Sequence, residues 1–166
     1  RGANEFHGED GPLSVSDIRI KLDILDEFRN AAEEMGIPKI NDFNTGDNFG
    51  CDYFQVTEKN GLRCSTAVAY LNPAKKRSNL KVDVRAHIKK INFEGKKAVG
   101  ISYWKNGKLI TVKTNKEVIL SAGSVNSPQI LMRSGVGNAE DIAPHGIQMN
   151  HELKGVGKNL QDHIGV

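Results

Sequence analysis

The stretch EVILSAGSVNSPQILMRSGVG constrains the fold of this chain more than any other part of it. It opens with an apolar run, residues 117–121, which has the length of one buried strand. A turn of small residues follows, in which Ala122 and Gly123 let another group approach the backbone closely. Ser127 then suits a helix N-cap and Pro128 suits the first helical position. We therefore predict strand, tight turn and helix, with a helix N-terminus that suits a phosphate.

The composition is that of a folded domain. The chain has 166 residues, of which 38% are hydrophobic and 26% charged, and this content is typical of globular proteins. No apolar run approaches the ~18 residues of a membrane-spanning helix, so no membrane span is expected. Cys51 and Cys64 fit neither a metal-ligand spacing nor a CxxC motif, so we interpret them as plain thiols.

The positive charge is concentrated in the middle of the chain. Residues 75–116 carry 13 Lys and Arg against 2 Asp and Glu, whereas the net charge of the whole chain is +3. Such a segment raises the alternative of nucleic-acid binding. A binder of that kind would interleave aromatic platforms with the basic residues, and only Tyr103 and Trp104 are available. We therefore expect a solvated sheet face and no nucleic-acid partner.

Two helices are predicted in the first half of the chain. Residues 17–35 carry apolar side chains at spacings of three and four, which places them on one helix face. That face consists of Ile18, Leu22, Leu25, Phe28, Ala32 and Met35. Gly36 and Pro38 are expected to end this helix. A short second helix over residues 65–71, capped by its first serine, should close before Pro73.

A small antiparallel ribbon is predicted after these helices. Residues 80–88 alternate strictly between apolar and polar, which is typical of a half-buried strand. The alternation slips by one residue at Lys89–Lys90, which indicates a β-bulge. Two further strands, residues 98–104 and 109–114, flank Asn106–Gly107, the pair most typical of a two-residue hairpin.

The remaining motifs assign no chemistry by themselves. The run GVGKNL, residues 155–160, fails as GxGxxG at Leu160 and fails as a P-loop at Asn159. There is no GxSxG elbow, and the five histidines show no metal-ligand spacing. We assign no catalytic residue and no metal ligand.

The residues 123–137, GSVNSPQILMRSGVG, resemble the second signature of the glucose–methanol–choline (GMC) oxidoreductases. Other segments follow the order of the same family, including HGEDGPL from His7, the run at residues 61–71, and residues 155–163. The match is most similar to insect-type glucose dehydrogenases. The resemblance covers essentially the whole chain.

This resemblance implies a mixed α/β (α+β) chain: a partial FAD-binding GMC fold with a small antiparallel β-ribbon, a βα unit and part of the substrate domain. Residues 1–61 would belong to the substrate domain and residues 62–150 to the middle of the FAD-binding domain. Residues 151–166 would begin the next substrate-domain segment.

The resemblance also implies an FAD-dependent oxidoreductase that transfers a hydride from the CH–OH group of a small-molecule alcohol to the flavin, with a separate electron acceptor. Ile88 would meet the adenine through its backbone, and Ala122 and Gly123 would lie close to FAD. The family's GxGxxG unit and its catalytic histidine have no counterpart here, so the chain is expected to be an internal fragment, inactive alone. Family members include secreted enzymes, but the sequence leaves the localisation open. The alternative is a non-catalytic binding or interaction module that keeps only the middle of the fold.

Overall fold

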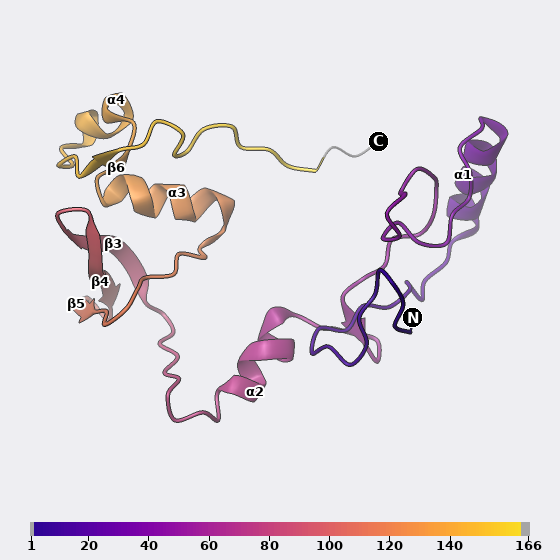
Figure 1. Cartoon of the computed structure of the whole chain (residues 1–166), viewed down its shortest axis with the longest axis horizontal. Coiled ribbons are helices and arrows are strands. Elements are labelled where there is room, and N and C mark those ends of the chain that lie inside the picture. The colour runs from indigo at the N-terminus through magenta and orange to yellow at the C-terminus, as the bar shows by residue number, and fades with distance from the viewer. Residues whose placement is uncertain (1, 164–166) are drawn as a thin grey trace. The chain divides into compact units, whose positions relative to one another are not determined.

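The computed structural model describes residues 2–163. The chain divides into two compact units, residues 1–82 and 83–166, and Figure 1 traces the elements of each in chain order. This division reflects backbone contacts within each unit and does not assign a function to either. The three-part assignment to substrate and FAD-binding domains stays a prediction. None of the helices within residues 2–163 is long and apolar enough to cross a membrane.

The first unit contains one long helix, α1 (Asp23–Glu34). It begins later than the expected residue 17, because the backbone of Ser16 pairs with that of Val56 and keeps the preceding segment extended. Its end agrees with the prediction, since Gly36 adopts a left-handed φ of 87°.

The predicted apolar face of α1 is not its packed face. Phe28 is 63% exposed and Met35 is 81% exposed, whereas Ala32 is buried. Arg29 reaches the rest of the unit instead, through an ion pair with Asp52 at 3.2 Å. The sequence pattern placed these side chains on one face, but periodicity does not supply the surface that covers it.

Short elements complete the first unit. The two-residue strands β1 (Glu58–Lys59) and β2 (Leu62–Arg63) form a hairpin. A π-helical turn, η1 (Ala67–Leu71), continues directly into α2 (Asn72–Ala74). The helix therefore runs through its proline rather than closing before it. Pro73 sits in the first turn of α2, where a missing N–H costs little.

The second unit is built on a three-stranded antiparallel sheet in the order β3-β4-β5. Its strands are β3 (His87–Glu94), β4 (Lys97–Lys105) and β5 (Lys108–Lys113). The predicted ribbon is confirmed, and so is the hairpin, in which Asn106 and Gly107 both have positive φ. The register shifts between Ile88 and Lys90, which confirms the predicted bulge.

Two segments predicted as strands are unpaired over most of their length. In residues 80–88 pairing begins only at His87, and Val84 is 65% exposed. The apolar run 117–121 has no strand partner among residues 2–163, and Ile119 is 79% exposed. Both predictions were wrong for the same reason: an extended backbone becomes a strand only where a neighbour supplies hydrogen bonds.

Helix α3 (Gly123–Arg133) follows the second of these segments. It begins earlier than predicted, so Pro128 lies inside the helix and Ser127 is not its N-cap. The Ser127 hydroxyl instead accepts a hydrogen bond from the Ala122 N–H at 3.0 Å. That bond fixes the small-residue turn against the helix.

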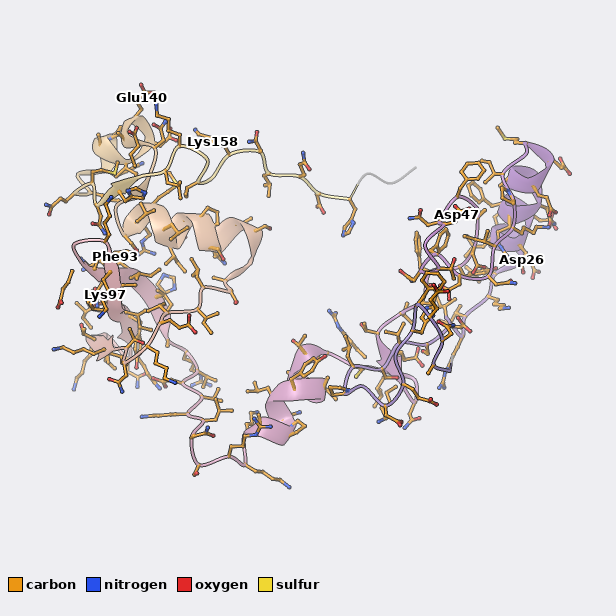
Figure 2. The ribbon with its side chains drawn as sticks, in the orientation of Figure 1. Asp26, Asp47, Phe93, Lys97, Glu140 and Lys158 are labelled. Carbon is orange, nitrogen blue, oxygen red and sulfur yellow. The ribbon has the colours of Figure 1, made fainter. Side chains whose placement is uncertain are left out.

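The last part of the second unit returns to α3. The strand β6 (Val136–Gly137) pairs in parallel with β7 (His151–Glu152). Between them lie α4 (Ala139–Ile142) and a 3₁₀ turn, η2 (Ala143–His145). Lys158 closes this region through an ion pair with Asp141 in α4 at 2.7 Å. Figure 2 labels Lys158 and Glu140, the neighbour of Asp141 in α4.

Candidate functional site

A small cleft separates the start of β3 from one face of α3. Its volume is about 200 Å³, and both Ile88 and Ala122 line it. The other lining residues are Ala86, His87, Asn126, Gln129, Ile130 and Arg133. The structure thus brings together two of the three residues to which the sequence assigned the cofactor. Their binding role itself stays a prediction.

Gly123, the third of these residues, follows Ala122 at the start of α3. It has a left-handed φ of 85°, and no atom lies within 4 Å of the position that a Cβ would occupy. Glycine adopts this conformation without steric cost and leaves the backbone open to a ligand. No side chain caps the helix at Ala122, so its first N–H groups are available to an acceptor.

The polar groups of the cleft come from the helix, and sequence reasoning missed them. Asn126, Gln129 and Arg133 occupy positions i, i+3 and i+7, which lie on one helix face. The signal was present in the sequence, but a helix starting at Pro128 would have left Asn126 in a turn. The Arg133 Nη1 donates a hydrogen bond to the carbonyl oxygen of Ile88 at 3.4 Å.

Ser134 sets the distance between the helix and the strand. Its hydroxyl donates to the Ile130 carbonyl at 2.6 Å and accepts the Ile91 N–H at 2.8 Å. Both bonds are buried. They join the C-terminal end of α3 to β3 directly beside the cleft, so the cleft has a fixed width.

Asp83 fixes the segment that leads into β3. Its carboxylate accepts a hydrogen bond from the Tyr103 hydroxyl at 2.7 Å and forms an ion pair with Lys105. The hydrogen bond to Asp83 is the main reason that the pKa of Tyr103 is raised above its usual value. Neither residue lines the cleft.

The cleft fits part of a cofactor, not a whole dinucleotide. Pockets that hold drug-sized molecules span about 300–1,000 Å³, and this one is smaller. Its small and apolar walls suit a flat ring, while amides such as Asn126 and Gln129 can both donate to and accept from a ring edge. The Ile88 carbonyl has a second lone pair beyond the one that Arg133 uses. The arrangement of these groups is therefore suited to binding and orienting a flat cofactor ring.

No metal centre is apparent in this part of the chain. Across residues 2–163 no group of three His, Cys, Asp or Glu side chains is placed to hold a metal ion. The two cysteines, Cys51 and Cys64, are free thiols, as predicted.

Comparisons with known proteins agree on one family. The family model described as GMC oxidoreductase matches residues 5–165. The chain is 42% identical over 165 residues to human mitochondrial choline dehydrogenase, covering 99% of this chain and 28% of that protein. It is 44% identical to alcohol dehydrogenase [acceptor] of Pseudomonas putida, covering 98% of this chain and 30% of that protein.

Solved structures give the same result. An FAD-dependent oxidoreductase from Chaetomium thermophilum matches with a TM-score of 0.85 and 29% identity, covering 93% of this chain and 27% of that one. Pyridoxine 4-oxidase from Mesorbium loti matches with a TM-score of 0.85 and 26% identity, covering 95% of this chain and 31% of that one. The chain thus spans less than a third of the length of these relatives.

Proposed function

The chain belongs to the GMC oxidoreductase family, and we propose that it forms the part of an FAD-dependent alcohol oxidoreductase that holds the adenine end of the cofactor. One observation carries this proposal: Ile88 and Ala122, which are far apart in the sequence, line the same small cleft. The mixed α/β architecture matches that of the solved relatives over most of the chain.

The cleft residues have distinct roles in this proposal. The backbone of Ile88 offers hydrogen bonds to the adenine edge, and the amides of Asn126 and Gln129 approach the ring from the helix. Ala122 and Gly123 leave room for the ribose and phosphate to pass along bare backbone. The N-terminus of α3 favours the negative charge of the phosphate.

The proposed substrate is an alcohol. The relatives include choline dehydrogenases and an alcohol dehydrogenase. We therefore propose choline or a simple alcohol as the substrate, in preference to the glucose that the sequence resemblance suggested. When bound, the flavin accepts the hydride of the alcohol carbon. The residues of this chain bind and orient the cofactor.

Nucleotide binding tests the proposal directly. AMP and FAD are titrated into the purified chain, and binding is followed by calorimetry. Both should bind, and Ala122→Leu should weaken them at least tenfold because the larger side chain fills the cleft. Val125→Leu is the matched control, since Val125 is exposed and lies outside the cleft. Absence of binding by both nucleotides, or equal affinity in Ala122→Leu, contradicts the proposal and favours a non-catalytic module.

A further inference from the structure

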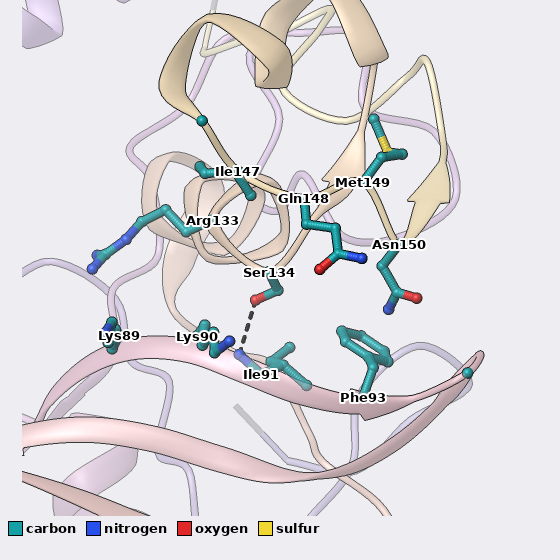
Figure 3. Close-up of a pocket in the computed structure, with 12 residues that line it drawn as sticks. Lys89, Lys90, Ile91, Phe93, Arg133, Ser134, Ile147, Gln148, Met149 and Asn150 are labelled. Atoms are coloured by element: carbon teal, nitrogen blue, oxygen red, sulfur yellow. Dashed lines mark hydrogen bonds between the residues drawn. The ribbon is translucent and has the colours of Figure 1, made fainter.

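A second and larger hollow lies further along the same strand. It is a groove of about 470 Å³ between β3 and the segment that follows η2. Figure 3 shows Lys89, Lys90 and Arg133 toward one end, and Phe93 and Asn150 toward the other. Arg133 forms a wall of both hollows.

The cationic end of the groove carries uncompensated charge. No Asp or Glu lines it. Among residues 2–163, Lys89, Lys90 and Arg133 form no ion pair with a carboxylate; the Lys89 ammonium lies 5.8 Å from the ring centroid of Trp104, and Arg133 donates only to a backbone carbonyl. Three positive charges around one concavity raise the local concentration of anions.

The β-bulge is what places two lysines at the same end. Neighbouring residues of a regular strand point to opposite faces of the sheet. The register shift leaves Lys89 without a cross-strand partner, between Ile88 paired with Tyr103 and Lys90 paired with Ser102. Because a bulge re-aims side chains, Lys89 and Lys90 both line the groove.

The opposite end is apolar with an amide rim. The Phe93 ring lies on β3, opposite the amides of Gln148 and Asn150 (Figure 3). A ligand that satisfies both ends therefore has a negatively charged head and an apolar tail.

A peptide strand is a poorer occupant than a small molecule. Adding a strand to a sheet edge requires free backbone hydrogen-bonding groups along that edge. On β3, the Ile91 N–H is already bonded to the Ser134 hydroxyl at 2.8 Å. The helix thus occupies the middle of this edge.

We propose that the groove binds a small amphiphilic anion, with its carboxylate or phosphate head between Lys89, Lys90 and Arg133 and its apolar chain against Phe93. The groove shares Arg133 with the cofactor cleft but is otherwise lined by different residues, and the proposal does not depend on the proposed enzymatic function.

Trp104 provides a built-in reporter for the test. It is the single tryptophan of the chain, and an anion that draws the Lys89 ammonium from its ring changes its fluorescence. The purified chain is titrated with sodium octanoate and with octyl phosphate, and calorimetry gives the affinity. Saturable binding of at least one is expected. The uncharged 1-octanol should bind at least tenfold more weakly, because hydrogen bonds to charged groups contribute most to such contacts.

Two variants separate the ends of the groove. Lys90→Gln should weaken the amphiphile by about tenfold, whereas Lys108→Gln, an exposed lysine of β5 outside the groove, should not change it. Phe93→Gln should weaken the amphiphile but leave inorganic phosphate unaffected. Adenosine, which carries no phosphate, should not displace octanoate.

Four results would overturn the inference. They are the absence of saturable binding, equal binding of 1-octanol, an equal loss in Lys90→Gln and Lys108→Gln, and displacement by adenosine.

Discussion

Ser134 and Gly135 are adjacent, and each closes a different contact of the second unit. Ser134 bonds α3 to β3. Gly135 has a φ of 79°, and a Cβ there would lie 2.3 Å from the carbonyl oxygen of Gln148. A larger residue would push away the segment that forms one wall of the anion groove. The Ser-Gly pair of the signature is therefore explained by packing at this junction.

Ser134→Ala should destabilise the chain by about 1–3 kcal/mol, because it leaves the buried N–H of Ile91 without a partner. Urea unfolding followed by Trp104 fluorescence measures the change. Ser121→Ala is the control, since Ser121 is exposed and should change stability by less than about 0.5 kcal/mol. Equal stability of the two variants would show that the Ser134 bonds contribute nothing.

The free energy of unfolding should fall in acid, because protonation of Asp141 removes its ion pair with Lys158. The Lys158 hydrogen bond is the main reason that the pKa of Asp141 is lowered from its ordinary 3.8. A carboxyl with a lowered pKa stabilises the fold above its unfolded pKa and loses that contribution as pH falls through the folded pKa. Lys158→Met should therefore lower the melting temperature at pH 6 but not at pH 2, whereas Lys154→Met, exposed and outside this pair, should have no such pH-dependent effect. A deficit of the same size at both pH values would contradict this.

At the scale of elements, residues 80–86 and 117–121 stand out because they form no strand pairs and expose apolar side chains, among them Val84 and Ile119. Ile119 is 79% exposed, whereas Ile142, the last residue of α4, is 1% exposed. Substitution by alanine should lower the free energy of unfolding strongly at the buried position and hardly at the exposed one. Ile142→Ala should cost about 2–5 kcal/mol, and Ile119→Ala less than about 0.5 kcal/mol.

Chemical denaturation of the two isoleucine variants checks this contrast. A loss above about 1 kcal/mol in Ile119→Ala would mean that residues 117–121 are packed in this chain. An exposed, unpaired apolar run can pair with another copy of the chain, so the measurement should be repeated at several protein concentrations.

At the scale of the whole molecule, the chain covers 28–30% of the choline and alcohol dehydrogenases that it resembles. The cleft supplies groups that bind, and we assign no catalytic residue. We therefore expect the purified chain with added FAD to reduce no dye with choline, ethanol or glucose. Steady turnover with any of these alcohols, above that of a heat-denatured sample, would contradict the proposal that it is an inactive part of the enzyme.

The sequence by itself determined the features that depend on a few neighbouring residues. The Asn106–Gly107 hairpin, the bulge at Lys89 and the glycine stop after α1 follow from local backbone preferences and from alternation. The family resemblance likewise identified Ile88, Ala122 and Gly123 as candidates.

Only the tertiary structure decided which extended runs pair, which face of α1 packs, and where α3 begins. It alone placed Asn126, Gln129 and Arg133 in the cleft. The physical reason is that local conformation depends on the residue and its neighbours, whereas pairing and burial depend on a partner surface from elsewhere in the chain. Residues 117–121 have the composition of a strand but no strand partner among residues 2–163.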